Sequence, residues 1–452
     1  MFDLDSAVAK ILGSAAYVGA ECEAWICRRV DQNIIVDSTG VTQWSSSAAS
    51  VSAVTVWRDG REGCAVVKGD DLGASAVEDA LSVGAVLPPS ERVARQFSTV
   101  RCDPSVRCDP SARCDPSAGA GYDEDNPEAV LSRLAALARC ADMDIELCAS
   151  LEHTQTAFGE TGGGYVEQAD QLACVQARIA ARGRGPAYIA RQFIGRTLGD
   201  ALDAADRALG MDAACRTVDI LSGEPVTWYP PVTVLLHGAV AARLLALLAP
   251  SLQLDAIQQQ RSRLAGRLGD AVGAEQISVI HDTTGVFTPI ALAFDDEGTP
   301  ARLTRLIHRG RLDSVLSDVR YAHQAGQTSN GCGWRPAGGG AVTVGPRALL
   351  LQWHGPHMPP PASSAEMTLE VVHANGMHIS NEITGDFSFG AVGVIRDVRG
   401  CARNAGAFTV AGNVLDLLAD VTGAVGSPCF VRRSGAIYGS PSLWVNGLTI
   451  GR

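Results

Sequence analysis

Four histidines in the C-terminal part of the chain are of the residue type that most often binds transition metals. His354 and His357 are separated by two residues, and His373 and His378 follow. Their four imidazoles could hold Zn²⁺ in tetrahedral geometry. A simpler interpretation is also open, because the first pair lies in a Pro-rich stretch and the second pair flanks Asn375-Gly376, a turn dipeptide. We treat the four as candidate ligands and expect no metal site in this chain.

Thiols are the second candidate for chemistry. Residues 101–118 repeat RCDPSV, RCDPSA and RCDPSA, which spaces Cys102, Cys108 and Cys114 evenly. These thiols could bind a soft metal or act in redox chemistry. A repeated coding unit in a tolerant surface loop explains the same pattern, since Asp-Pro-Ser favours turns and no second ligand type is present. The sequence has thirteen cysteines but no CxxC pair, which argues against a zinc ribbon or a thioredoxin-type site.

Carboxylates form the third candidate. Asp295, Asp296 and Glu297 are consecutive and precede a glycine. Such a run could serve in general acid–base catalysis or bind a hard cation. It could equally be a solvated or hydrogen-bonded turn that leads into the next hairpin, and we favour this structural or interface role. Asp386 follows Gly385 and is predicted to fix a turn through the backbone.

Composition limits the class of protein. The chain has 452 residues, 46% of them hydrophobic, and a formal net charge of −12, so a folded protein of several domains is expected. The acidic balance argues against nucleic-acid binding, which needs clustered basic residues. Lys10 and Lys68 are the only lysines, a bias typical of GC-rich bacterial genomes.

Neither the start of the chain nor its most apolar stretch predicts contact with a membrane. The first ten residues contain two aspartates and no basic segment of the kind that opens a signal peptide. Residues 231–250 are the most apolar long stretch, but they contain His237 and Arg243 and are bounded by prolines. We therefore expect a buried strand and helix there and a cytoplasmic location.

The N-terminal part is predicted to be α+β. Helices are expected over residues 7–12 and 76–83, and strands over 23–27, 51–56 and 64–67, with a turn at 58–63. We assign residues 1–97 to an N-terminal mixed sheet-and-helix domain. Residues 98–125, which hold the repeat, are expected to be a disordered insertion loop.

Residues 126–225 are predicted to form a central α+β domain. A helix should start at Asn126-Pro127, strands are expected at 145–151 and 171–179, and a Gly-rich turn at 162–164 separates them. That turn lacks the spacing of a phosphate loop. One amphipathic helix is predicted over residues 196–214, with apolar residues on one face.

Residues 226–452 are predicted to form a β-rich domain with few helices. A strand at 231–236 should lead into a helix at 239–249, followed by a strand at 277–280 and a hairpin over 303–316 that turns at Arg309-Gly310. Asn413 should cap a helix that presents Leu415, Leu418 and Val421, with Gly423 just past its end. Residues 443–450 are predicted to form a hairpin around Asn446-Gly447.

The C-terminal half resembles the TldD/PmbA family of bacterial metallopeptidase subunits, also named modulators of DNA gyrase. Six segments match family motifs in the family's order, and the resemblance covers nearly all of the chain outside the repeat. The segments are 294–300 (FDDEGTP), 306–312 (LIHRGRL), 327–331 (QTSNG), 381–390 (NEITGDFSFG), 411–413 (AGN) and 439–443 (GSPSL).

The resemblance implies a family of two branches that pair as a heterodimer. The TldD branch carries an HExxxH helix, whose histidines bind zinc together with a C-terminal cysteine and whose glutamate is placed to act as a general base. The PmbA branch, also called TldE, lacks this motif, and the TGDFS and GSPS segments of this chain resemble that branch.

The HExxxH motif is absent from this chain, which contains no His-Glu dipeptide. The sequence nearest to the motif begins at His237-Gly238. An alternative register, which aligns the helices better, places Ala246, Leu247 and Ser251 at the motif positions. A single ligand cannot hold Zn²⁺, so His237 is interpreted as a histidine near a strand-to-helix turn. Cys401 and Cys429 lie near the region of the catalytic cysteine and are interpreted as inert thiols.

The function implied by the resemblance is that of a non-catalytic PmbA/TldE-like subunit. It would pair with a zinc-bearing TldD-like subunit that cleaves peptide or amide bonds, in maturation of a peptide or natural-product precursor, and would itself bind no cofactor. Two alternatives stay open: a regulatory or binding protein without a role in proteolysis, and a stand-alone hydrolase that uses the histidine cluster. Candidates for a substrate channel or subunit interface are Asp295, Asp296, Glu297, Asn330, Asn381, Asp386, Ser388 and Asn413.

Overall fold

The computed structural model describes most of the chain as two sheets with helices packed against them, which confirms the predicted α+β class. The repeat with its three cysteines lies outside the described residues, as do His357 and His378. The described residues are 3–69, 75–87, 127–139, 142–183, 188–207, 210–229, 232–356, 367–377, 380–397 and 399–451.

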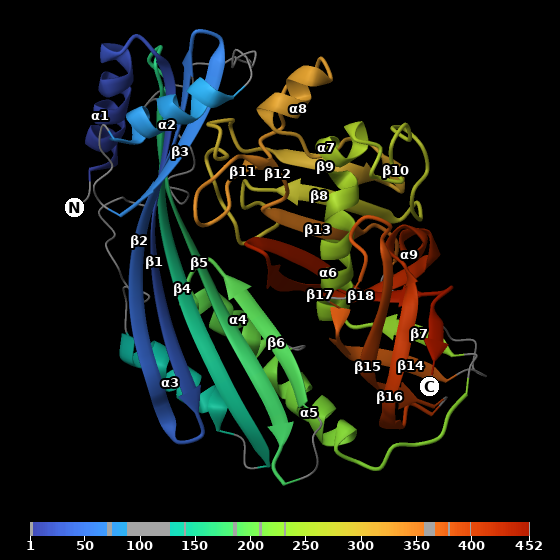
Figure 1. The fold of residues 1–452 in the computed structure, drawn as a ribbon. Helices are drawn as coiled ribbons and strands as arrows, with labels where there is room; N and C mark the ends of the chain where they lie inside the picture. Colours follow the sequence, from blue (N-terminus) through green and yellow to red (C-terminus); the bar gives the residue numbers. More distant parts are fainter. Residues whose placement is uncertain are drawn as a thin grey trace.

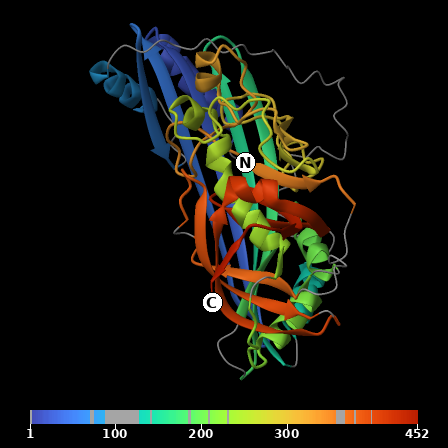
Figure 2. The same cartoon turned by 90° about the vertical axis from the view of Figure 1, so that its right-hand side faces the viewer.

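Within those ranges, the N-terminal part builds a six-stranded antiparallel sheet whose long, curved strands run along nearly the whole height of the molecule (Figures 1 and 2). Residues 1–97 and 126–225, expected as two units, contribute to this one sheet, because β1 pairs with β4 over most of its length. In spatial order the strands are β3 (Arg61–Lys68), β2 (Gly40–Arg58), β1 (Glu21–Asp37), β4 (Met143–Glu160), β5 (Tyr165–Ala181) and β6 (Tyr188–Gly195).

Helices cover the two ends of this sheet. Two apolar clusters lie there, one under α1 and α2 and the other under α3, α4 and α5. The middle of β1 is only half-buried, which leaves a polar stretch between the clusters. The helices are α1 (Leu4–Tyr17), α2 (Ser75–Val86), α3 (Pro127–Ala138), α4 (Leu198–Asp206) and α5 (Met211–Leu221).

The C-terminal part is built on a mixed sheet of eleven strands among the described residues, one of which, β17 (Val421–Arg433), lies off the main order and pairs with β18. The hairpin that turns at Arg309-Gly310 is confirmed, although its second strand has two residues. The other strands, in spatial order, are β10 (Arg311–Leu312), β9 (Leu303–His308), β8 (Ile277–Asp282), β13 (Ala348–Trp353), β18 (Ala436–Val445), β7 (Thr233–Leu236), β14 (Thr368–Asn375), β15 (Asp386–Arg396), β16 (Ala402–Asn413) and β19 (Thr449–Gly451).

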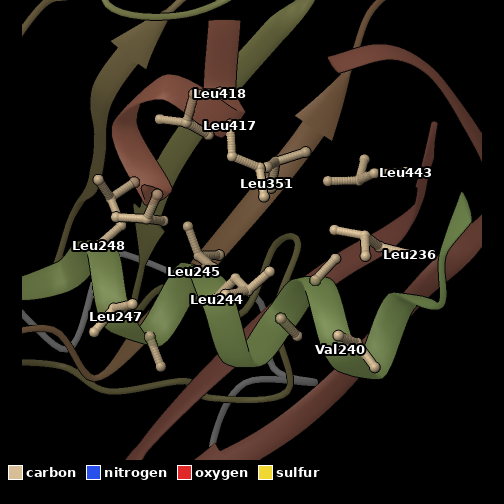
Figure 3. Packing of buried hydrophobic residues seen from close by; sticks show 14 of the residues in the cluster. Leu236, Val240, Leu244, Leu245, Leu247, Leu248, Leu351, Leu417, Leu418 and Leu443 are labelled. Carbon is tan, nitrogen blue, oxygen red and sulfur yellow. The ribbon is translucent and has the colours of Figure 1, made fainter. Parts of the chain in front are cut away.

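Helix α6 (Gly238–Leu248) lies at the centre of the C-terminal part and against its sheet. Its sequence, GAVAARLLALL, is rich in strong helix formers, and every residue except Ala239 and Arg243 is buried. Figure 3 shows Leu244, Leu245 and Leu248 packed with leucines of β13 and α9 (Val414–Asp420). Because each fully buried leucine contributes about 1.5–3 kcal/mol, this packing fixes the position of the helix.

Shorter elements complete the C-terminal part. They are the 3₁₀ helix η2 (Ala249–Leu252), α7 (Leu254–Gln258), α8 (Val319–Gln324) and the strand pair β11 (Gly333–Trp334) and β12 (Thr343–Val344). No helix in the described ranges combines the length and the apolar character that crossing a bilayer requires.

The single helix predicted over residues 196–214 is wrong, because the chain forms α4 and α5 there. The backbone at Arg207 is extended, with ψ of 167°. Gly210 then approaches Ala205 so closely that a Cβ on it would lie 1.8 Å from the Ala205 carbonyl oxygen. The break lets both helices turn their apolar faces toward the same cluster.

The hairpin predicted around Asn446-Gly447 is also wrong. Both edges of β18 are occupied at residues 443–445, by β7 on one side and by β17 on the other. The chain after the turn therefore pairs elsewhere, and β19 adds to β16. Asn413 caps α9 as predicted, but the helix ends at Asp420, and Val421 begins β17.

Candidate functional site

A pocket of about 540 Å³ opens at the start of α6 and brings together chemically reactive side chains from distant parts of the sequence. His237 comes from the start of α6, Cys429 from β17 and Arg191 from β6. The pocket has the size of a small-ligand site.

His237 is the N-cap residue of α6, and its ring is held by the helix. Nδ1 accepts a hydrogen bond from the Ala239 backbone N–H at 3.1 Å, which leaves Nε2 as the nitrogen free to act. Burial holds the pKa of His237 well below its usual range, and the positive charge of Arg191 lowers it further. The imidazole is therefore neutral at physiological pH.

Gly238 follows His237 and is packed without space for a side chain. A Cβ at this position would lie 2.7 Å from the Ser440 carbonyl oxygen and 3.0 Å from Cys429 Sγ. The Gly238 N–H donates to Ser442 Oγ at 3.0 Å, which fixes the backbone against β18. A glutamate cannot replace Gly238 in this backbone arrangement.

Cys429 is the thiol at this site. Burial raises its pKa, although the charge of Arg191 and a hydrogen bond from the Ala239 N–H lower it in part. His237 and Cys429 together supply two donors, whereas zinc sites use at least three protein ligands. The described residues contain no group of three or more metal-ligating side chains. The residues of this pocket thus do not fit a zinc ion.

Arg191 is a buried cation at the same pocket, with 6% of its surface exposed. Nη1 donates to the Ala190 and Val372 carbonyls at 3.0 and 3.2 Å. Burial lowers the pKa of Arg191 to about 10, and the guanidinium stays charged at neutral pH. Sequence reasoning missed this residue. The sequence feature that could have indicated a buried arginine is the alternation of Ile189, Arg191 and Phe193, which places Arg191 on the inward face of β6.

Asp295, Asp296 and Glu297 are 0%, 3% and 5% exposed, and they organise loops within the chain. Asp295 Oδ1 accepts from the backbone N–H groups of Glu297 and Thr299, and Oδ2 from that of Gly333. Glu297 Oε2 accepts from the Val319 N–H at the start of α8. Burial first, and the charge of Glu297 second, hold the pKa of Asp295 well above its usual range. This is the hydrogen-bonded turn that the sequence favoured.

Asp296 joins the two sheets. Oδ1 accepts from the Trp25 indole N–H of β1 at 3.0 Å, and Oδ2 accepts from the Arg335 backbone N–H at 2.7 Å. Asn330 fixes a neighbouring loop, because it accepts from Ser317 and donates to the Val315 carbonyl. A role for these residues at a subunit interface stays a prediction.

The two described histidines of the predicted cluster have separate partners. His354 Nε2 lies 2.9 Å from Ser278 Oγ of β8, and burial lowers its pKa. His373 of β14 packs against the Tyr188 ring, with 5.7 Å between ring centroids. Burial lowers the pKa of His373 to about 4, with further contributions from Arg243 and Arg191.

The remaining predicted residues lie in and beside the turn that leads into β15. Asn381 Oδ1 accepts from the Ile383 and Thr384 N–H groups. Asp386 accepts from Thr384 Oγ1 and from Asn413 Nδ2, which lowers its pKa. Ser388 is exposed on β15. These contacts support the prediction that Asp386 fixes a turn.

Comparison with known proteins agrees with this architecture. Residues 231–452 match the family described as the PmbA/TldA metallopeptidase C-terminal domain. The chain is similar in structure to TldE from Thermococcus kodakarensis, with a TM-score of 0.84, 18% identity and coverage of 99% of this chain and 100% of that one. A Thermotoga maritima protein proposed as a modulator of a DNA gyrase gives a TM-score of 0.79, at the same identity and coverage.

A sequence relative is more limited in extent. An uncharacterized protein of Methanocaldococcus jannaschii is 31% identical over 147 residues, which span 31% of this chain and 33% of that protein. At 18% identity the structural similarities establish a shared fold. The match to the family model assigns residues 231–452 to the PmbA/TldA metallopeptidase C-terminal domain.

Proposed function

We propose, since this chain belongs to the TldD/PmbA family, that it is the non-catalytic, TldE-like subunit of a heterodimeric metallopeptidase. Its partner would be a TldD-like subunit that holds the zinc ion and the general base. The complex would cleave peptide or amide bonds, and the non-catalytic subunit would wall off the cleft and hold an extended substrate by strand addition.

The start of α6 carries this proposal. In the register that begins at His237, Gly238 takes the position of the glutamate of the catalytic branch, and it is packed against Ser440 and Cys429. In the alternative register, Ala246, Leu247 and Ser251 take the motif positions, and all three are buried. Neither register provides, at the motif positions, a general base or a second histidine ligand of the kind that activates a metal-bound water.

Metal content and hydrolysis test the proposal. The purified chain alone should contain negligible zinc by elemental mass spectrometry and should cleave no peptide. Co-expression with a TldD-like subunit should give a complex with about one zinc and chelator-sensitive hydrolysis. Replacement of the glutamate in the partner's HExxxH motif by glutamine should abolish that hydrolysis. About one zinc in the isolated chain would refute the proposal and direct attention to His354, His357, His373 and His378.

The pathway is a second part of the proposal. Two observations motivate it: the lysine-poor composition is typical of a GC-rich bacterial genome, and the RCDPS insertion and the HGPH segment at residues 354–357 diverge from the family pattern. We infer a role in the maturation of a peptide or natural-product precursor in a bacterium. Deletion of the gene should then leave an uncleaved precursor that mass spectrometry detects, and unchanged metabolites would count against this role.

A further inference from the structure

The pocket at the start of α6 contains a buried positive charge with unused hydrogen-bond donors. Nη1 of Arg191 is satisfied by two carbonyl oxygens, but Nε and Nη2 have no acceptor among the described residues. No carboxylate in those ranges forms an ion pair with Arg191. Glu370 is near enough to act on the charge of Arg191, but the ion pair it forms is with Arg396. A buried guanidinium that no carboxylate contacts directly is costly, and it favours binding of an anion from outside the chain.

The charges around Arg191 also favour an anion. Arg196 and Arg207 line the same pocket, and Asp200 is its one acidic lining residue. Asp200 Oδ2 already accepts from the Thr197 N–H in the capping box of α4. His237 adds no charge, because its imidazole is neutral. The lining thus has a net positive charge.

The rest of the lining is apolar. Phe193, Ile194 and Phe430 lie along the wall, and Val286 and Phe287 stand at the pocket with 67% and 49% of their surfaces exposed. Covering exposed apolar side chains beside a pocket removes them from water, which makes binding of a ligand more favourable. The pocket therefore combines one position that favours an anion with an apolar lining.

We propose that this pocket binds the C-terminal end of a peptide, with the terminal carboxylate on Arg191 and an apolar last side chain against Phe193 and Phe430. The inference rests on the proposed function, because it names the part of a peptide that the non-catalytic subunit would hold. A planar guanidinium matches a carboxylate in a bidentate arrangement. The volume of about 540 Å³ accommodates one or two residues.

Binding to the full unmodified chain tests the inference without any variant. The probe is an alanine-rich hexapeptide that ends in leucine and carries an N-terminal fluorescein, and binding is followed by fluorescence anisotropy. The free acid should bind at least about tenfold more tightly than the otherwise identical C-terminal amide, because the amide removes the charge. Equal binding of acid and amide would overturn the proposal.

A variant then locates the site. Arg191→Gln should reduce the preference for the acid to near unity, and Arg191→Lys should keep part of it because the charge remains without the planar fork. Arg139→Gln is the matched control, since Arg139 is exposed at the end of α3. A preference that survives in Arg191→Gln, with the circular dichroism spectrum unchanged, would place the anion elsewhere and contradict the assignment.

Competition separates a peptide end from a free carboxylic acid. Octanoate carries the same charge and an apolar chain but no peptide groups. We expect it to displace the probe at least about tenfold less well than the unlabelled hexapeptide. Equal displacement would refute the peptide assignment. None of these measurements depends on a partner or on hydrolysis, so the pocket could fail while the subunit proposal stands, and the reverse.

Discussion

Gly238 occupies the first position of α6, where the Ser440 carbonyl and the Cys429 thiol leave no room for a methyl group. At the residue scale, this contact restricts position 238 to glycine in the present backbone arrangement. Any larger side chain at this position would require β17 or β18 to move.

Gly238→Ala should therefore destabilise the chain by about 1–3 kcal/mol, because overpacking forces the surrounding backbone to shift. Chemical denaturation measures the effect as a lower midpoint. Gly13→Ala is the matched control, since Gly13 lies in α1 with nothing within 4 Å of its Cβ position. That substitution should stabilise by about 0.5–1 kcal/mol. Equal midpoints for Gly238→Ala and the unmodified chain would contradict the packing described.

The acidity of Asp170, on β5, gives a pH-dependent prediction. Burial raises its pKa to about 7, and the charges of Arg347, Glu152 and Arg196 act on it in smaller amounts. Between about pH 4 and pH 7 the folded chain keeps a proton that the unfolded chain has released, so this residue lowers the free energy of unfolding as the pH rises.

Asp170→Asn should abolish that contribution. Its stability relative to the unmodified chain should rise between about pH 4 and pH 7 and then level off, measured as the difference in denaturation midpoints. A difference that does not change with pH would show that Asp170 is ionised in the folded chain throughout this range. Asp144→Asn provides a control, because Asp144 is exposed and pairs with Arg182 at the surface.

At the scale of elements, α9 depends on a cap that also ties it to the turn before β15. Asn413 Oδ1 accepts from the Leu415 N–H, and Nδ2 donates to the Thr384 carbonyl and to Asp386 Oδ1. One side chain therefore starts the helix and closes the turn of the TGDFS segment. This geometry explains why both segments carry short polar residues.

Asn413→Ala should lower the free energy of unfolding by about 1–3 kcal/mol, because it removes the cap and leaves the turn carbonyl without its donor. Asn33→Ala, in the half-buried middle of β1, should change it by less than about 0.5 kcal/mol. Denaturation curves of the two variants give the comparison. If both variants matched the unmodified chain, the cap would contribute nothing to the stability of α9.

At the scale of the whole molecule, the two sheets are joined by specific polar contacts rather than by apolar packing alone. The Trp25 indole binds Asp296, and Glu152 of β4 pairs with Arg432 of β17. Gln168 of β5 makes three hydrogen bonds to the turn before the acidic run, with the Ala293 and Phe294 N–H groups and the Phe294 carbonyl. These contacts connect the N-terminal sheet to the C-terminal part, together with the apolar clusters that span both.

Gln168→Ala should loosen this junction. Amide exchange at Ala293 and Phe294 should accelerate about tenfold, since each lost hydrogen bond contributes about 1 kcal/mol. Hydrogen–deuterium exchange with mass spectrometry reports the effect, with Gln43→Ala on the exposed part of β2 as the control. Unchanged exchange at residues 293–294 would mean that other contacts hold the turn in place.

The sequence by itself determined many of the local elements and indicated the family. Local sequence predicted strands within β4 and β5 and the apolar helix α6, a single Asn predicted the cap of α9, and six ordered motifs predicted the TldD/PmbA resemblance that the profile match confirms. The absence of an HExxxH motif also indicated the TldE-like branch. These features depend on residues that are close together in the sequence, so they can be predicted from the sequence alone.

Only the tertiary structure decided the pairings and the pocket. Because both edges of β18 are occupied, β19 pairs with β16. The close contact between Gly210 and Ala205 lies where the one predicted helix divides into two. Arg191, His237 and Cys429 meet although long stretches of sequence separate them. Such meetings depend on the packing of the whole chain, and a residue's local sequence carries little information about which distant side chain will lie beside it.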